Sequence, residues 1–515
     1  MKKTVIFILL AILAVGAAGC TNGKTVEPVS QAYYPAESWR TSAPEEQGMD
    51  SGLLADMVSA IQTGGKRVDS ITIIRNGYKV NETYFYPYQK GMLHALNSCT
   101  KSFVSALTGI AIGEGSIKSA DEKVTGYFPE LNIANLDERK QKLRIRDLLS
   151  MTSGLDWQFT NDASTKEMDK SPNFTKYTLD LPMKEEPGQT FLYANGALHA
   201  AAAILMKATG KTPEAYAAEK LEPLGIRDLY WGKSPEGVNR GDAGLFLRPD
   251  DMAKLGYLYL NKGKWGGRQL VPERWVEAST RTQAKPDWGD MFPGYGYGWW
   301  IPRFGGYTAM GNGSNFIFVL PEYSLVAVFT GGIYVNEDMF YPAELVERFI
   351  IPAVKSGTPL PANTTGAAAL KQAVQTAGEA PAPQMAGRLP ETAKAISGKP
   401  FRFEDGTVMT LNFQERSSGF TLELNGKLKV DGGLDGRYRI NDTGNALGTL
   451  PDHNHMAFKG EWTAADTFRI TEQNMEDAFI SVYEFRFNGN NIEMKAHSNF
   501  NAGTTEGTSR ATIVN

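Results

Sequence analysis

Cysteine and histidine are scarce in this sequence, and it has no excess of basic over acidic charge. Its 515 residues include two cysteines and five histidines, and its formal net charge is −4. Two cysteines cannot build a disulfide-stapled scaffold, and a chain of this length has enough core to fold without one. Nucleic-acid binding is not expected, because no basic excess is present to pair with phosphates. The length favours more than one globular domain.

The N-terminus holds the chain's long apolar run. Lys2 and Lys3 precede an apolar stretch over residues 5–18, which is too short for an ordinary membrane span and is typical of a signal peptide. The stretch ends in Ala-Ala-Gly-Cys at Cys20, which resembles a bacterial lipoprotein processing site. Residues 1–20 are therefore expected to be a lipoprotein signal peptide, and residues 21–35 a flexible tether.

This resemblance implies that Cys20 is lipidated. The protein would then be exported and held by a lipid anchor at the bacterial cell envelope, on the non-cytoplasmic side of a membrane and facing the periplasm in a Gram-negative host. A soluble secreted form is the alternative, because Ala17 stands where leucine is more typical. With Cys20 lipidated, Cys99 has no disulfide partner and is expected to be a small buried side chain.

Residues 36–355 have strand patterns at both ends and helical patterns between them. Residues 69–86 predict a hairpin, because strand-like runs flank Asn76-Gly77. Apolar residues at helical spacing predict a helix that starts near Ser98 and ends at Gly113 and Gly115. Further helices are expected over residues 143–151, 197–208, 250–261 and 343–351, and strands over 315–320 and 325–330. This order predicts an α/β (α+β) domain whose antiparallel sheet is built from both ends, with a helical insertion.

The remainder of the chain changes character twice. Residues 356–395 are rich in Ala, Pro, Thr and Gly, which predicts a linker with a short helix around 370–377. Residues 396–515 are β-rich, with Asn-Gly turns at 425–426 and 488–489. Strands are expected over residues 407–413, 420–424, 427–430, 467–471, 480–487 and 492–496. They predict a separate antiparallel barrel or sandwich domain.

A Ser-His-Asp triad has little support in this chain. No Gly-x-Ser-x-Gly elbow occurs, and no histidine lies in a recognisable triad setting. Ser98 and Lys101 offer another route, since residues three apart on a helix share a face. At a helix start both would lie in the positive end of the macrodipole, which favours an oxyanion and disfavours a protonated lysine. Taken alone, the pair also fits a surface helix start with serine as its N-cap.

Several segments resemble the serine β-lactamase and penicillin-binding-protein superfamily. Residues 97–103, Asn-Ser-Cys-Thr-Lys-Ser-Phe, resemble its active-site tetrad. Residues 148–155 resemble its LLxHTSGL segment, with methionine at the histidine, and residues 186–195 resemble its PGxxFxYSN segment. Matches to TGK and PLGM follow in the expected order. The resemblance implies a β-lactamase-like sheet domain with a helical lobe, closest to 6-aminohexanoate-dimer hydrolase-like proteins and esterase relatives.

The same resemblance implies roles for Tyr193 and Asn195. Tyr193-Ala194-Asn195 matches the tyrosine motif of class C β-lactamases, D,D-peptidases and related esterases. By this match Tyr193 is a general base or proton shuttle, and Asn195 contacts Lys101 and the substrate. A tyrosine of pKa about 10 needs a nearby cation to act as a base. Lys101 could supply that cation, so the two groups would titrate together.

The third family motif departs from its pattern here. The corresponding strand reads Tyr307–Phe316, and no Lys or His precedes Gly311. In β-lactamases and D,D-peptidases that cation helps to hold the substrate carboxylate. Gly311 and Gly313 still permit close backbone approach to a substrate. The backbone N–H groups of Ser98 and, by alignment, Asn312 are the expected oxyanion hole, with a shift to Ser314 as the alternative.

The sequence therefore predicts a serine hydrolase that cleaves ester or amide bonds of a small molecule or peptide. Ser98 would be acylated with the assistance of Lys101 and Tyr193, and water would release the acyl group. Neither a metal nor an organic cofactor is required. Trp157 is a candidate for substrate contact at the rim of the site. Alternatives are a D,D-peptidase or β-lactamase, and a non-catalytic lipoprotein that binds a ligand at the same site.

Overall fold

The computed structural model describes residues 33–35, 38–333, 337–384, 388–413, 418–444, 454–498 and 505–514. The predicted signal peptide, Cys20 and residues 21–32 of the predicted tether lie outside the described residues. Within the described part of the chain, no helix is both long and apolar enough to cross a membrane. The described helices and strands belong to one unit, Tyr34–Asn515.

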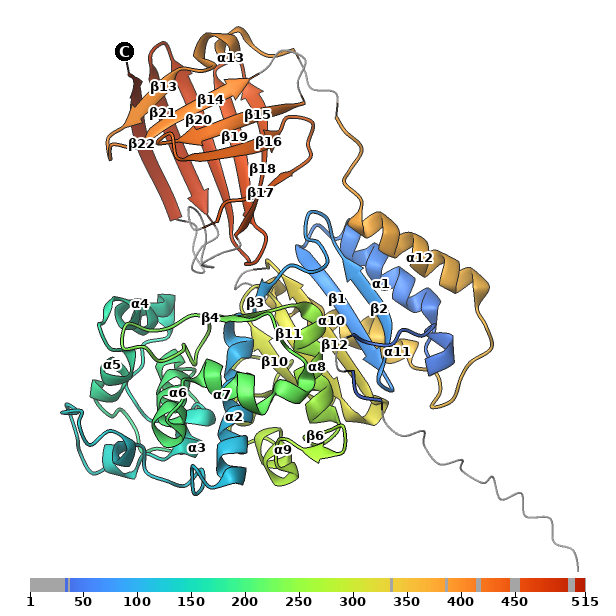
Figure 1. Ribbon diagram of the computed structural model, residues 1–515, viewed down its shortest axis with the longest axis vertical. Coiled ribbons are helices and arrows are strands. Elements are labelled where there is room, and N and C mark those ends of the chain that lie inside the picture. Colours follow the sequence, from blue (N-terminus) through green and yellow to red (C-terminus); the bar gives the residue numbers. More distant parts are fainter. Residues whose placement is uncertain are drawn as a thin grey trace, which may run out of the picture. The chain divides into compact units, whose positions relative to one another are not determined.

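A seven-stranded antiparallel sheet forms the centre of the N-terminal domain (Figure 1). Its order is β2-β1-β12-β11-β10-β9-β8. The strands are β1 Val68–Arg75, β2 Tyr78–Tyr84, β8 Gly294–Tyr295, β9 Trp300–Ile301, β10 Tyr307–Gly311, β11 Asn315–Leu320 and β12 Leu325–Gly331. β1 pairs with β12 along its length, so the predicted sheet built from both ends of the segment is confirmed. Asn76 and Gly77 have φ of 52° and 83°, which makes the predicted hairpin turn possible.

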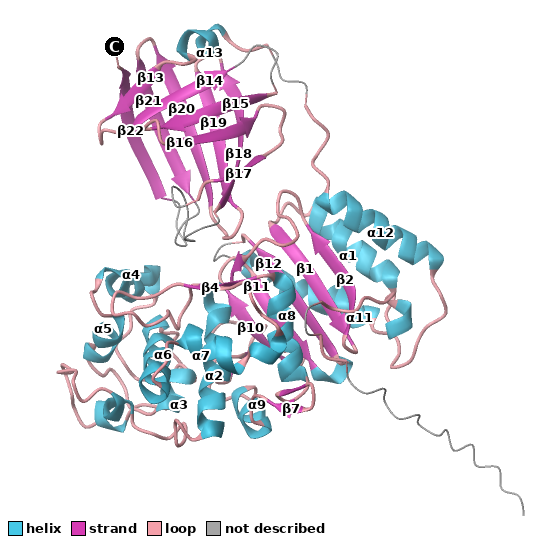
Figure 2. Cartoon of the chain, in the orientation of Figure 1, coloured by secondary structure: helices cyan, strands magenta, loops and turns pink. Residues whose placement is uncertain are grey.

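In the sequence the helical insertion lies between β2 and β8, and Figure 2 shows helices gathered beside the sheet. Its helices are α2 Thr100–Glu114, α3 Ile145–Leu149, α4 Ala163–Lys170, α5 Phe174–Asp180, α6 Asn195–Thr209, α7 Pro213–Lys220, α8 Pro249–Leu260 and α9 Glu273–Ser279. Short strands accompany them: β3 His94–Ala95, β4 Tyr230–Trp231, β5 Leu245–Leu247, β6 Lys264–Trp265 and β7 Arg268–Gln269. Gly115 and Gly210 adopt left-handed φ at the ends of α2 and α6, where a side chain would be strained.

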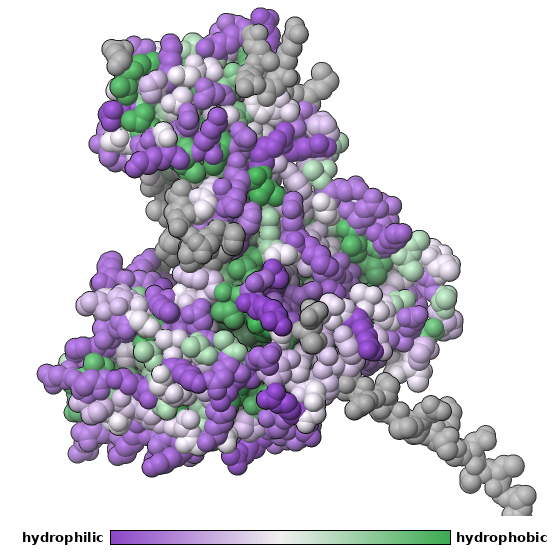
Figure 3. Space-filling model, in the orientation of Figure 1, coloured by the Kyte–Doolittle hydropathy of each residue, from purple (hydrophilic) through white to green (hydrophobic). Residues whose placement is uncertain are grey.

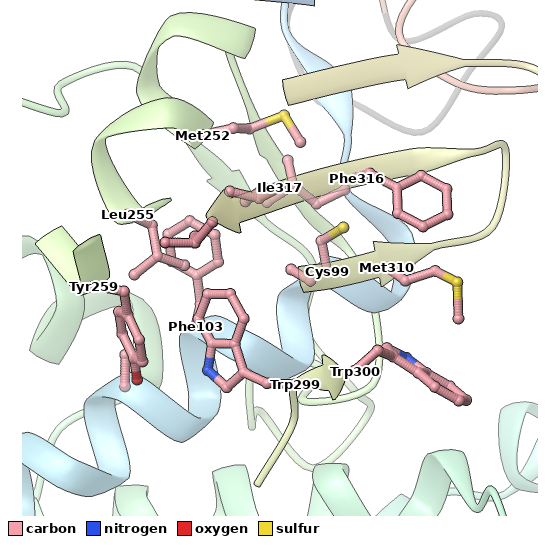
Figure 4. Close-up of a cluster of buried hydrophobic side chains, with 14 of the residues drawn as sticks. Cys99, Phe103, Met252, Leu255, Tyr259, Trp299, Trp300, Met310, Phe316 and Ile317 are labelled. Carbon is pink, nitrogen blue, oxygen red and sulfur yellow. The ribbon is translucent and has the colours of Figure 1, made fainter. Parts of the chain in front are cut away.

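A continuous apolar core joins the insertion to the sheet. α8 packs on β1, β11 and β12. Gly256 of α8 allows this approach, because a Cβ there would lie 2.7 Å from Val326. Figure 4 shows residues of α2 and of the turn that precedes it meeting residues of α8 and the sheet: Cys99, Phe103, Met252, Leu255 and Ile317. The start of α2 is thus fixed against a rigid sheet.

Part of the predicted linker is a long helix. α12, Thr364–Gly378, packs against α1, Ser51–Thr63. Leu370, Ala373 and Ala377 are buried on one face of α12, so this helix belongs to the core of the N-terminal domain. The N-terminal domain also contains the closing helical segment, which comprises α10 Tyr341–Leu345, a π-helical turn Val346–Ile350 and α11 Ile351–Ala353.

The C-terminal domain is a closed β-barrel, which confirms the barrel alternative over the sandwich. Its strands are β13 Pro400–Phe403, β14 Val408–Phe413, β15 Gly419–Leu424, β16 Leu428–Gly433, β17 Arg439–Asp442, β18 His455–Ala464, β19 Thr467–Asn474, β20 Ile480–Asn488, β21 Asn491–Ser498 and β22 Thr505–Ile513. Closure occurs where β16 meets β18 at Gly433 and Lys459. The helix α13, Glu391–Ile396, contributes to a phenylalanine-rich core of its own.

Candidate active site

The nucleophile candidate lies on a strained turn at the base of α2. A 3-10 turn over Asn97–Cys99 connects β3 to the helix. Asn97 has φ of 47°, a left-handed conformation that asparagine tolerates better than most residues. Its side-chain Nδ2 donates to the carbonyl of Asn312 at 3.0 Å, which ties the turn to the end of β10. Ser98 is half-buried at the start of the helix.

Lys101 is the direct hydrogen-bond partner of Ser98. Its Nζ lies 2.7 Å from Ser98 Oγ and 2.7 Å from the carbonyl oxygen of Asp242. The side chain is 1% exposed. Burial lowers the pKa of Lys101 from 10.5 to about 8, and the negative charge of Asp242 opposes that decrease. A minor but accessible fraction of Lys101 is therefore neutral at pH 7, and this neutral form can accept the Ser98 proton.

Asp242, whose carbonyl accepts a hydrogen bond from Lys101, forms a buried ion pair with Arg240. Arg240 donates to both carboxylate oxygens of Asp242, at 3.2 Å and 2.8 Å, and also pairs with Asp169 at 3.0 Å. Burial alone would raise the pKa of Asp242, but the charge of Arg240 lowers it to about 2. This pair could not be predicted from the sequence, because neither residue lies within a recognised motif.

Tyr193 joins the same cluster. It lies two residues before the start of α6 and is 8% exposed. Lys101 Nζ lies 4.9 Å from the centroid of the Tyr193 ring. Burial raises the pKa of Tyr193 well above 10, although hydrogen bonding to Ser98 acts in the opposite direction. The tyrosine is therefore protonated at neutral pH, so it is better suited to donate a proton than to abstract the first one.

Three aromatic side chains surround the Tyr193 ring. Trp300 stacks on it with centroids 5.9 Å apart and an interplanar angle of 27°, and Trp288 lies at 5.2 Å. Phe159 approaches edge-on at 5.8 Å and is 40% exposed. Among the described residues, Leu136 and Phe159 are the large hydrophobic side chains that are exposed, whereas the face of the molecule seen in Figure 3 is mostly hydrophilic. The side of the site next to Tyr193 is thus apolar and reaches solvent.

The motif segments recognised in the sequence lie against one another. Leu192 N–H donates to the Met151 carbonyl at 2.8 Å, and Ala194 N–H points at Met151 Sδ at 3.3 Å. Met151, which replaces the family's usual histidine, thereby backs the tyrosine segment. Gly298, from the glycine-rich run before β9, would place a Cβ 2.8 Å from the Lys101 carbonyl. Because Gly298 has no side chain, this run can pack directly on α2.

Gly311 brings the end of β10 onto the nucleophile turn. A Cβ on Gly311 would lie 2.3 Å from the Leu96 carbonyl and 3.1 Å from the Ser98 nitrogen. The close approach observed is to the turn that carries Ser98, and substrate contact at Gly311 stays a prediction. Asn312, the proposed oxyanion donor, follows at the strand end. Ser314 directs its hydroxyl to the Met339 carbonyl at 2.9 Å, away from the turn.

Two other predicted residues occupy different positions from those expected. Asn195 donates to Thr165 Oγ1 at 3.0 Å, and its Oδ1 is buried with no hydrogen-bond partner among the described residues. The two hydrogen bonds described for Lys101 go to Ser98 and Asp242. Trp157 is 2% exposed and packs behind α6, against Gly196 and Tyr177. It does not form the rim; Phe159 is the exposed aromatic residue at this edge.

Cys99 and His94 are both buried and hydrogen-bonded within the fold. Cys99 is fully buried and directs Sγ to the Asn315 carbonyl at 3.3 Å, and burial raises the pKa of its thiol. Both ring nitrogens of His94 are engaged, by Asp69 at 3.1 Å and the Ala95 carbonyl at 3.0 Å. Within the described part of the chain, no group of three or more His, Cys, Asp and Glu side chains could hold a metal.

Comparisons with known proteins agree with this geometry. Residues 54–338, more than half of the chain, match the family model described as Beta-lactamase. An uncharacterized protein of Alkalihalophilus pseudofirmus is 24% identical over 294 residues, which are 50% of this chain and 82% of that protein. Beta-lactamase-like protein 2 of Dictyostelium discoideum is 30% identical over 142 residues, 25% of this chain and 24% of that protein.

A solved structure shares the fold. It is a provisionally assigned 6-aminohexanoate-dimer hydrolase from Bacillus anthracis, with a TM-score of 0.51 and 20% sequence identity. The similarity covers 64% of this chain and 90% of the other. At this identity the likeness concerns the fold alone.

Proposed function

The chain belongs to the Beta-lactamase family, and on that premise we propose that it is a serine hydrolase that cleaves ester or amide bonds through an acyl-enzyme on Ser98. The observation that carries this proposal is the 2.7 Å contact between Ser98 Oγ and a buried Lys101 whose pKa is lowered to about 8. A hydroxyl becomes a nucleophile when a base of suitable pKa lies within hydrogen-bond reach.

The geometry supports a division of labour between the two titratable groups. Neutral Lys101 accepts the proton of Ser98 as Oγ attacks the carbonyl carbon. The backbone N–H groups of Ser98 and Asn312 are the proposed donors to the oxyanion. Protonated Tyr193 then donates its proton to the leaving oxygen or nitrogen as the carbonyl–heteroatom bond breaks. Water attacks the resulting ester on Ser98, and the same groups return the protons.

An uncharged, apolar substrate fits this site best. Phe159 and Trp288 provide apolar surface beside Tyr193, which suits an aliphatic or aromatic acyl group. Buried Met310 occupies the position before Gly311, so β10 supplies no cation there for a substrate carboxylate. We therefore favour neutral esters or amides over penicillins and peptidoglycan peptides.

The test is covalent labelling combined with hydrolysis assays. A fluorophosphonate probe should add once to the protein, and peptide mass spectrometry should locate the adduct on Ser98. Ser98→Ala should abolish both labelling and p-nitrophenyl ester hydrolysis. Ser105→Ala, a serine substitution further along α2, is the matched control and should retain both. Labelling at another residue, or full hydrolysis by Ser98→Ala, would refute the proposal.

A substrate panel addresses specificity and the non-catalytic alternative. p-Nitrophenyl esters of increasing acyl length, nitrocefin, D-amino-acid amides and aminohexanoate dimers cover the chemistries considered. We expect the highest kcat/KM for the apolar esters. Binding of these compounds without any acyl adduct in intact-protein mass spectra would instead indicate a ligand-binding protein.

A further inference from the structure

A turn of the C-terminal barrel lies against the nucleophile-bearing segment. The turn, Met475–Phe479, connects β19 to β20 and is called the β19–β20 turn below. Its Glu476 carbonyl accepts a hydrogen bond from the Ala95 N–H at 2.6 Å. Asp477 Oδ1 accepts one from Asn97 Nδ2 at 3.4 Å. Both contacts are within three residues of Ser98, although the turn is almost 400 residues further along the chain.

Arg67 fixes the backbone of this turn to the N-terminal domain. Its guanidinium donates to both carboxylate oxygens of Asp69, each at 2.9 Å. The same Nη2 lies 3.0 Å from the carbonyl oxygens of Asn474 and Asp477. Met475 is fully buried in an apolar cluster with Tyr88. The turn is therefore held by charge-assisted hydrogen bonds and by apolar packing.

The turn also touches the end of β10. A Cβ on Gly313 would lie 2.9 Å from Ala478 Cβ, so no space separates the barrel from the strand end beside Asn312. Asp477 is 5% exposed, and its Oδ1 additionally accepts from the Ala478 N–H at 2.7 Å. The hydrogen bond from the Ala478 N–H thus holds the Asp477 carboxylate in an orientation in which it can accept from Asn97.

Asn97 links three parts of the site. Its backbone is in the strained turn before Ser98, and its Nδ2 donates to the Asn312 carbonyl as well as to Asp477. The side-chain amide of the residue before Ser98 is therefore hydrogen-bonded both to the proposed oxyanion donor, Asn312, and to the barrel. Strained conformations of this kind persist only when neighbouring groups hold them.

We propose that the β19–β20 turn is an integral part of the active site, in which Asp477 is a positioning residue that acts through Asn97 on Ser98 and Asn312. This inference rests on the proposed hydrolase function. In the absence of the Asp477 acceptor, the Asn97 amide can rotate. The Asn97–Cys99 turn then no longer keeps a fixed position against the end of β10. Acylation depends on that position, because small displacements of reacting groups have large effects on rate.

The experiment compares full-length Asp477→Ala with Asp477→Asn. Asparagine keeps an Oδ1 acceptor for Asn97, whereas alanine removes it. We expect Asp477→Ala to lower the second-order rate of fluorophosphonate labelling and kcat for an activated ester about tenfold, with little change in KM. Asp477→Asn should stay within about twofold of the parent protein. Asp466→Ala, in the β18–β19 turn of the same barrel, is the matched control and should have no effect.

A double-mutant cycle keeps the test independent of stability. Asn97→Gly removes the amide while permitting the left-handed backbone, and Asp477→Ala should add no further rate loss in that background. Thermal unfolding identifies a variant that fails to fold, in which case Asp477→Gly, which also removes the acceptor, takes its place. Unchanged labelling rates in a folded variant that lacks any side-chain hydrogen-bond acceptor at position 477, or additive effects in the cycle, would overturn the inference alone. A parent protein that is never labelled at Ser98 would overturn the hydrolase function and this inference with it.

Discussion

The lowered pKa of Lys101 predicts how hydrolysis depends on pH. Lys101 accepts the Ser98 proton only in its neutral form, so kcat/KM should rise as pH increases through a pKa of about 8. With that value, the neutral fraction is about 9% at pH 7 and about 91% at pH 9. The expected increase in kcat/KM across this interval is therefore about tenfold.

Asp242 and Arg240 provide a test of the cause. The charge of Asp242 raises the pKa of Lys101 and that of Arg240 lowers it. Asp242→Asn keeps the backbone carbonyl that accepts from Lys101, and should move the midpoint of the profile down by about one pH unit. Arg240→Gln should move it up. The assay is p-nitrophenyl ester hydrolysis from pH 6 to 10, with the rate measured for Ser98→Ala subtracted as background.

Two results would refute this reasoning. A kcat/KM that is flat between pH 7 and 9 would mean that Lys101 is not the titrating base. A midpoint that moves up in Asp242→Asn would mean that the charges around Lys101 do not set its pKa. Ionic strength should have little influence on the shifts, because these groups are buried.

Three further predictions follow from the same cluster. Lys101→Met should abolish activity but raise the free energy of unfolding at pH 7 by roughly 1 kcal/mol, measured by urea denaturation. Removing the burial penalty contributes about 3 kcal/mol, and the lost hydrogen bonds to Ser98 and Asp242 subtract about 1 kcal/mol each. The pKa of Lys101 is lower in the folded than in the unfolded protein, so the parent protein should itself gain stability as the pH rises from 8 to 10.5. An unchanged urea midpoint for Lys101→Met would contradict the expected gain in stability. Tyr193→Phe should lower kcat about 100-fold with little change in KM, and an unaltered kcat would exclude the proton-donor role. Trp288→Ala should raise KM about tenfold for long-chain or aromatic esters but hardly for the acetate, and equal effects on all esters would exclude an acyl-binding role.

The fold could be predicted largely because its signals are local. The hairpin at Asn76-Gly77 and the helix after Ser98 depend on residues close in sequence, and both are present. The composition of residues 356–395, rich in Ala, Pro, Thr and Gly, predicts a linker with a short helix around 370–377, whereas α12 is longer and packs in the N-terminal domain. The small face that α12 buries consists of Leu370, Ala373 and Ala377. It can be recognised as a packing face only from the contact with α1, which lies far away in the sequence. The strand β22 is rich in polar residues and likewise depends on its barrel neighbours.

The candidate site divides in the same way. The contact between Ser98 and Lys101 follows from helical spacing, and the resemblance located Tyr193. The residues that adjust the site were missed: Asp242 sets the charge around Lys101, and Asp477 meets Asn97 from another domain. Neither has a local pattern, since each matters through a contact across more than 100 residues of chain. Such contacts are a property of the tertiary structure.

The packing of α12 has a consequence for how the barrel stays associated with the site. Because α12 ends at Gly378 and α13 begins at Glu391, only residues 379–390 connect the two domains, and these can span at most about 40 Å. A barrel joined this closely has an effective concentration near the nucleophile turn in the millimolar range. Weakening one contact therefore changes the time that the β19–β20 turn spends in place by much less than it would for separate molecules. Enzyme turnover, rather than domain separation, is the sensitive measure of that contact.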